Sequence, residues 1–280
     1  MKLLISIFIL IVCGALIFIN AQDPFTTTRS AQMELNAGDA AYKERRFSDA
    51  EAHFRSALQL DPSEKRTKVF LARTLHQLYL SNRQLPENRQ KGEEAIAFYQ
   101  VLLVEDPNDE ATNDALSGSI GALKGSQALT EWRQKRADNE AVKPEYRVKA
   151  FTFLASEKYN CVNEVTEAGK DTVLKKGEAV FVFKMVDNYS DFLTARQCAD
   201  DGLILIDKAL ALDDTKSSPN SYKASLLIQK SRLAEMEGNK SDIVKYQTEA
   251  ATFKRRFQAL SEQEAKRREE EEKQKPESPQ

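Results

Sequence analysis

Few residues in this chain could carry out chemistry. The three cysteines (Cys13, Cys161 and Cys198) and two histidines (His53 and His76) are its only thiols and imidazoles in 280 residues. A zinc site needs about four such ligands at short spacings, and these five residues lie far apart. The sequence also lacks a glycine-rich phosphate loop, a metal-binding histidine pair and a nucleophile elbow. We therefore predict no enzyme, no metal and no cofactor.

The charge balance argues against a basic nucleic-acid-binding surface along the whole chain. Lysine and arginine number 41 against 43 aspartates and glutamates, for a net charge of −2, whereas nucleic-acid-binding domains are basic. Hydrophobic residues make up 41% of the chain, and an apolar N-terminal segment contributes many of them. The rest of the chain therefore has fewer hydrophobic residues than one compact globular domain of its length would need. We expect no nucleic-acid partner and an elongated fold with a large wet surface.

The first 21 residues form a targeting element. Residues 3–19 are apolar apart from Ser6 and Gly14, and a helix of that length spans about 25 Å, the lower limit for a bilayer. Ala21 supplies a small residue for cleavage. The segment is either a cleaved signal peptide or a single N-terminal anchor. In both cases we expect export to the periplasm or the extracellular space, with an inner-membrane tether in the second.

Three segments of the sequence end alike. Residues 57–62, 102–107 and 209–214 read ALQLDP, LLVEDP and ALALDD. Each is typical of the last turn of an amphipathic helix, and the residue before a proline is disfavoured in the helical region. The recurrence predicts an internal helical repeat.

The best repeat resembles the tetratricopeptide (TPR) family. The resemblance implies an all-α solenoid of antiparallel helix pairs, with small residues where the helices cross and large ones filling the gap. Glu34 and Ala37 stand where the family prefers tryptophan and leucine, which suggests a terminal, capping repeat. The matching positions are Gly38, Ala41, Tyr42, Phe47, Ala50, Phe54, Ala57 and Pro62.

The resemblance divides the chain into five units. The second unit is longer than the family's repeat, and its surplus falls around residues 82–90, where Pro86 and polar residues predict an extended connection. We expect a linker at 22–30, a charged helical extension from 254 to about Glu272, and a disordered tail to 280. The repeats are expected at 31–64, 65–109, 110–143, 144–215 and 221–253, within a domain spanning 31–253.

The fourth unit contains an insertion. Residues 161–166 and 179–186 are rich in β-branched and aromatic side chains, with Gly169 and Gly177 between them. This composition favours a small β-hairpin at about 160–187. The alternative is that residues 180–186 continue a buried helix.

Cys161 and Cys198 are then expected to form a pair. If Cys161 closes the first helix of this unit and Cys198 lies in the first turns of the second, the antiparallel helices bring them together. Disulfides persist in oxidising compartments. In the chain-entropy treatment, a disulfide that closes the loop between these two residues stabilises the fold by about 4 kcal/mol. The alternative is two buried free thiols.

The resemblance also implies a partner-binding surface. TPR proteins bind extended peptides or partner helices on a concave face lined by first helices; the alternative is an ordinary solvated face. Leu35 and Asp39 stand where carboxylate-clamping relatives carry lysine and asparagine, which argues against that mode. We expect an exported protein-interaction scaffold or, alternatively, a membrane-tethered envelope assembly factor. The expected partner-binding positions are Leu35, Asp39, Tyr42, Lys43, Val69, Arg73, His76 and Gln77.

Overall fold

The computed structural model describes residues 24–274, with side chains from residue 28 onward. The predicted targeting segment and the end of the predicted disordered tail lie outside this part of the chain. No helix within it is long and apolar enough to cross a membrane. The elements are α1 (Pro24–Lys43), α2 (Phe47–Leu60), α3 (Lys65–Ser81), α4 (Pro86–Glu105), α5 (Glu110–Asp138), α6 (Pro144–Ala168), β1 (Lys170–Lys175), β2 (Glu178–Phe183), α7 (Tyr189–Leu212), α8 (Ser217–Met236) and α9 (Lys240–Lys273).

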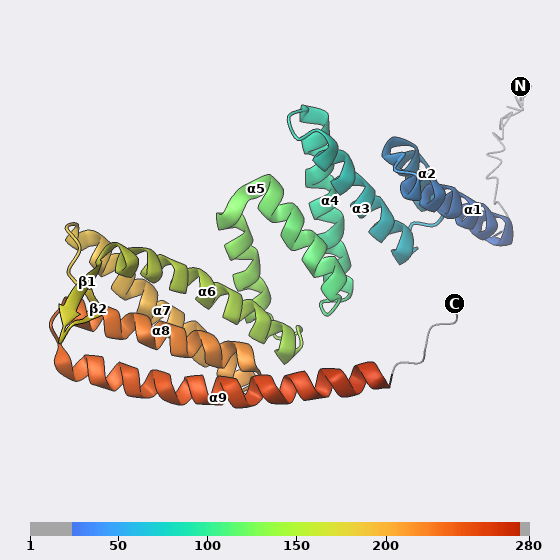
Figure 1. Ribbon diagram of the computed structural model, residues 1–280. Helices are drawn as coiled ribbons and strands as arrows, with labels where there is room; N and C mark the ends of the chain where they lie inside the picture. Colours follow the sequence, from blue (N-terminus) through green and yellow to red (C-terminus); the bar gives the residue numbers. More distant parts are fainter. Residues whose placement is uncertain (1–23, 275–280) are drawn as a thin grey trace, which may run out of the picture.

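Antiparallel pairing of successive helices organises the fold. The most extensive contacts join α1 to α2, α3 to α4, α6 to α7, and α8 to α9. Figure 1 shows these pairs following one another, with α1 and the β-hairpin at opposite ends of the molecule. The predicted all-α solenoid with a small β insertion is confirmed.

Helix α5 supplies a further pair by folding back on itself. Its direction reverses at Gly125, which has φ 86° and ψ −177°, a backbone conformation that glycine adopts most readily. Across the reversal, the Trp132 indole donates a hydrogen bond to the Asn113 side chain at 3.2 Å. A single glycine therefore replaces the loop between the two helices.

Glycines permit the close approach of paired helices. Gly38 of α1 lies against the Phe54 ring of α2, and a Cβ placed there would be 2.5 Å from Phe54 Cε1. Phe54 is fully buried. In the second half of the fold, Gly202 of α7 lies close both to Lys158 of its paired helix α6 and to Leu226 of α8, which belongs to the next pair. The predicted contact of Gly38 with Phe54 is confirmed.

The hydrophobic core is divided between two halves of the solenoid. One large cluster runs from Leu35 in α1 to Leu123 in α5. Smaller clusters fill the bundle of α6, α7 and α8, the first of them beginning with Ala137 and Val148. The boundary between the halves falls where the second part of α5 meets α6.

The β-hairpin is confirmed, but its first strand was misplaced by the sequence pattern. Residues 161–166 belong to α6, because Val162 and Thr166 are buried there and packing overrides their β propensity. The strands pair Lys170 with Phe183 and Lys175 with Glu178. The alternative of a helix over residues 180–186 is wrong.

The predicted disulfide between Cys161 and Cys198 is present and joins α6 to α7, with Cα atoms 6.3 Å apart. Cys161 does not close its helix as expected, because α6 continues to Ala168. The bond therefore ties the two helices together alongside the hairpin, not at the end of α6.

Substitutions at Gly38 test the helix crossing. Gly38→Leu is expected to lower the free energy of unfolding by about 1–3 kcal/mol, because the added atoms overlap the buried Phe54 ring. The matched control is Gly118→Ala in α5, where a Cβ meets no atom within 4 Å; it should raise stability by about 0.5–1 kcal/mol. Urea unfolding measures the stability of these two variants and of Gly38→Ala, which makes the same change as the control at the crossing. An equal gain in stability from Gly38→Ala and Gly118→Ala would contradict the close crossing.

Candidate functional site

The residues expected to bind a partner are spread over α1 and α3. In α1, Leu35 is only 3% exposed and belongs to the core, so its side chain is closed to a partner. Asp39 and Lys43 form an ion pair of 2.8 Å along the helix. Tyr42 packs edge-on against Phe47, with ring centroids 5.4 Å apart. This helix thus offers mainly Lys43, Asp39 and the outer part of Tyr42.

The expected residues of α3 face their neighbours as well as solvent. Val69 packs against the large core cluster, while Arg73 and Gln77 are half-buried. His76 Nδ1 lies 3.0 Å from the Ser119 hydroxyl of α5, and burial lowers the pKa of its imidazole. Partner docking on this surface stays a prediction.

The candidates for chemistry are kept apart. His53 Nδ1 lies 2.8 Å from Glu34, His76 faces α5, and both described cysteines are joined in the disulfide between α6 and α7. Residues 24–274 contain no cluster of three or more metal-ligating side chains. These residues form no catalytic group in the described structure.

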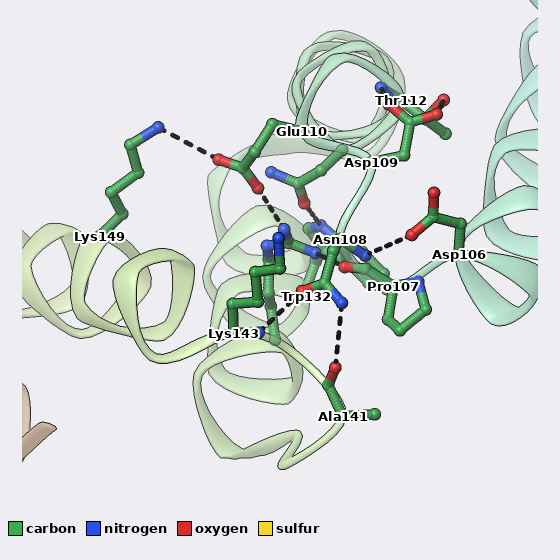
Figure 2. Close-up of polar contacts among 12 residues, drawn as sticks. Asp106, Pro107, Asn108, Asp109, Glu110, Thr112, Trp132, Ala141, Lys143 and Lys149 are labelled. Atoms are coloured by element: carbon green, nitrogen blue, oxygen red, sulfur yellow. Dashed lines mark hydrogen bonds and ion pairs between the residues drawn. The ribbon is translucent and has the colours of Figure 1, made fainter.

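A polar junction fixes the start of α5 against the loop before α6. Asn108 donates a hydrogen bond to the Ala141 carbonyl at 3.3 Å and accepts one from the Lys143 backbone at 2.7 Å. The Asp109 carboxylate caps α5 by accepting a hydrogen bond from the Thr112 backbone at 3.1 Å. Figure 2 shows Asn108 between the loop that joins α4 to α5 and the loop that joins α5 to α6. One side chain therefore holds the two loops together.

Charged groups complete this junction. Arg136 has a side chain only 5% exposed and forms an ion pair with Glu110; it also donates to the Pro107 carbonyl at 3.1 Å. Lys149 of α6 lies 3.1 Å from the same Glu110 carboxylate. A buried charge is tolerated only when it is paired and hydrogen-bonded, and these contacts meet both conditions. They set the position of α6 relative to α5.

A groove opens beside this junction. A cavity of about 580 Å³ lies between α6, α8 and α9, and a second of about 170 Å³ lies between α5 and α6. Both are lined by Tyr146, Lys149 and Phe153, so the two cavities adjoin each other. Together they are named the α5–α6–α8 groove. Its other lining residues are Glu110, Asn113, Asp114, Ser117, Arg133, Arg136, Glu145, Val148, Ala150, Thr152, Ser156, Lys216, Ser217, Ser218, Pro219, Tyr222 and Glu264.

The walls of the groove are aromatic. Phe153 is 40% exposed, and the Arg133 guanidinium lies 3.1 Å from the centre of its ring. Lys149 lies 5.7 Å from the centre of the Tyr146 ring. Such contacts hold the rings in place while leaving apolar surface open to a partner. The groove can therefore receive apolar side chains.

Most charges in the groove are already paired. Lys149 and Arg136 both contact Glu110, and Arg133 lies 3.7 Å from Glu157. The lining carboxylates of Asp114 and Glu145 form no ion pair within residues 28–274. Asp114 and Glu145 are therefore lining carboxylates that a basic side chain of a partner could still pair with.

Glu264 of α9 closes one end of the groove by capping α8. It accepts hydrogen bonds from the Ser217 backbone at 2.9 Å and the Ser217 hydroxyl at 2.7 Å. Burial raises the pKa of Glu264, but these hydrogen bonds, with Arg267 and Lys216 nearby, lower it overall. The carboxylate thereby joins the last helix to the start of α8.

Sequence reasoning missed the groove. Phe151, Leu154 and Ala155, spaced along one face of α6, are its buried stripe. Phe153 lies off that stripe, and an aromatic residue at such a position was the available signal. Tyr222 and Glu264 come from distant helices, so no local pattern could place them here.

Comparisons with known proteins find similarity to solved structures alone. No protein-family model and no curated protein matches the chain. Among solved structures, it is similar to MamA (13% identity, 85% of this chain and 95% of that chain, TM-score 0.41). It is also similar to PilF of Pseudomonas aeruginosa (12%, 85% and 99%, 0.34) and to TTC0263, a TPR protein of Thermus thermophilus (18%, 82% and 98%, 0.28). The stacked helix pairs themselves define a TPR-like α-solenoid, and these low-scoring similarities add nothing to that assignment.

Glu264→Ala tests the cap on α8. At pH 7 the variant should be about 1 kcal/mol less stable, because the Ser217 backbone loses its acceptor. Since the folded-state pKa of Glu264 is lowered, the stabilisation is complete above the ordinary value of 4.5 and is lost as pH falls through the folded-state value. The difference in unfolding free energy between the wild type and Glu264→Ala should therefore shrink as the pH is lowered from 7 to 3. Glu262→Ala on the exposed side of α9 is the control, and an equal effect there would contradict the cap.

Proposed function

We propose that this protein is an exported scaffold that holds a protein partner in the α5–α6–α8 groove. The observation that carries the proposal is the groove itself, a cavity of about 580 Å³ that adjoins one of about 170 Å³. Helical solenoids use extended surfaces of this kind to bind peptides and partner helices. The cavity volume also matches that of ordinary binding sites, about 300–1,000 Å³.

The partner we propose is an extended segment with an apolar side chain next to a basic one. The apolar side chain would pack between Phe153, Tyr146 and Tyr222, all of which line the main cavity. The basic side chain would approach the unpaired carboxylates of Asp114 or Glu145. Aromatic pockets provide most of the binding energy at such interfaces, and complementary charge adds specificity.

The α1–α3 surface is a second docking candidate on the same solenoid. Its accessible groups are Lys43, Arg73 and Gln77, with the ring of Tyr42. It offers mixed charge without a cavity of the size found beside α6. We propose it as an extension of the binding surface for a long partner.

Peptide display tests the groove. Selection on the purified protein should enrich segments in which an aliphatic or aromatic residue neighbours lysine or arginine. Phe153→Ala should weaken their binding at least tenfold, because truncating an aromatic anchor costs about 2 kcal/mol. The matched control is Ile204→Ala on α7, which is 57% exposed and outside the groove. Equal binding by the two variants, or enrichment of acidic peptides, would contradict the proposed site.

Export is supported by two features. The apolar segment at residues 3–19 is typical of targeting, and the disulfide of Cys161 with Cys198 suits an oxidising compartment. The alternative, a membrane-tethered envelope assembly factor, differs only in whether the segment is retained.

Mass spectrometry of the cellular protein distinguishes the two forms. A mature chain that begins at Gln22 indicates cleavage and release, and we expect this form in the periplasmic or extracellular fraction. A chain beginning at Met1 or Lys2 in the membrane fraction indicates the tethered form. A full-length chain in the cytoplasm with both cysteines reduced would contradict export altogether.

A further inference from the structure

The β-hairpin pairs with no third strand in the described chain, and helix α8 lies against β2 at Phe183. Within the described chain its sheet contains two strands, β1 and β2, and Figure 1 shows it at one end of the molecule. A two-stranded hairpin is marginally stable alone, and each open edge presents unpaired N–H and C=O groups. The hairpin is therefore a template for a further strand.

The outward-pointing backbone groups of β2 follow from one hydrogen bond. The Lys184 N–H donates to the Gly169 carbonyl at 2.8 Å, so Lys184 bonds towards the β1 side. Because antiparallel strands alternate, Val182 and Val180 also bond inward, while Phe183, Phe181 and Ala179 point outward. No hydrogen bond from outside the hairpin reaches these three residues in the described structure.

The edge of β2 is the apolar one. Residues 179–183 read AVFVF and carry no charge, and Phe181 is 64% exposed. Strand β1 instead carries Lys170, Asp171 and Lys175, and charges on an edge oppose further pairing. Aromatic and β-branched residues favour a paired strand. A partner strand is therefore expected on β2.

We propose that β2 pairs antiparallel with β2 of a second copy of this chain, about a two-fold axis at Phe181. This register places Phe181 opposite Phe181 of the second copy, and Val180 opposite Val182. It also places Glu178 of each copy opposite Lys184 of the other. Residues that face each other share a side of the sheet, and in this register the phenylalanines lie on one side and the valines on the other.

Charge within the strand favours a second copy over another partner. Glu178 precedes the apolar run and Lys184 follows it. In an antiparallel self-pair, opposite charges therefore face each other at both ends of the run. Lys184 already forms an ion pair with Asp171, so in the pair of chains it lies between two carboxylates. Glu178 forms no ion pair within residues 28–274. The inference does not depend on the α5–α6–α8 groove, which no hairpin residue lines.

Cysteine cross-linking tests the register. Phe181→Cys is made in full-length protein carrying Cys13→Ser, so that the new thiol is the only free one. Residues facing each other in a hydrogen-bonded pair have Cα atoms about 5.5 Å apart, which suits a disulfide. Mild oxidation should give a covalent dimer on non-reducing gels. The matched control is Thr172→Cys, the neighbour of Phe181 in β1 on the same side of the sheet, and it should stay monomeric.

Three outcomes of this experiment would overturn the proposal. The first is no covalent dimer from Phe181→Cys, and the second is equal cross-linking of Thr172→Cys, which would indicate face-to-face contact. The third is cross-linking of Phe181→Cys in cells to a protein of different mass, which would assign the edge to another partner.

A proline variant provides an independent measurement. Phe181→Pro removes an N–H that points away from β1, so the hairpin keeps its own hydrogen bonds. Light scattering of the purified chain should give twice the chain mass for the wild type and one chain mass for the variant. A wild type that is monomeric, or a variant that stays dimeric, would overturn pairing through β2.

Discussion

The close packing of neighbouring helices at residues without side chains, both within a pair and between pairs, is the constraint on which this fold depends. Gly38 against Phe54 and Gly202 against Leu226 occur in different halves of the solenoid, and in both places a large buried side chain fills the space that the glycine leaves. Each pair buries one surface internally and needs its neighbour to bury the next. The molecule therefore grows along one direction and keeps two long faces in water, which accounts for the low hydrophobic content outside the N-terminal segment.

The polar junction between α5 and α6 interrupts this regular growth and creates the groove. Hydrophobic packing joins the helices on either side, but at the junction Arg136, Glu110 and Lys149 share one network. Ion pairs and the two hydrogen bonds of Asn108 have stricter geometry than apolar packing, so they fix α6 in one orientation. That orientation turns Tyr146 and Phe153 towards α8, and the open apolar surface follows from the same contacts that hold the halves together.

The parts of the fold that sequence could predict are those written in local patterns. The spacing of Gly38 and Phe54 within one repeat predicted the helix crossing. The positions of Cys161 and Cys198 favoured the disulfide over two free thiols, although Cys161 does not close its helix as expected. The unit expected at 110–143 implied a helix pair, but its reversal was not located at Gly125, because a glycine inside a helical stretch carries no flanking signal. Residues 161–166 were misassigned because burial against α7 and α8 outweighs β propensity. The groove combines Phe153, Tyr222 and Glu264, and no local pattern relates residues so far apart.

The two proposed surfaces are spatially compatible. The groove uses the first half of α6 and the start of α8, whereas the hairpin follows the end of α6 and contacts the end of α8 through Phe183 and Arg232. A helix of 20 residues separates its ends by about 30 Å, so pairing through β2 leaves the groove open. A pair of chains would then present two grooves related by a two-fold axis. A partner assembly that carries two binding segments could occupy both grooves at once. Its second segment would then bind at a high effective concentration, which a single groove cannot provide. Self-pairing would thus strengthen partner binding without adding any contact to the groove.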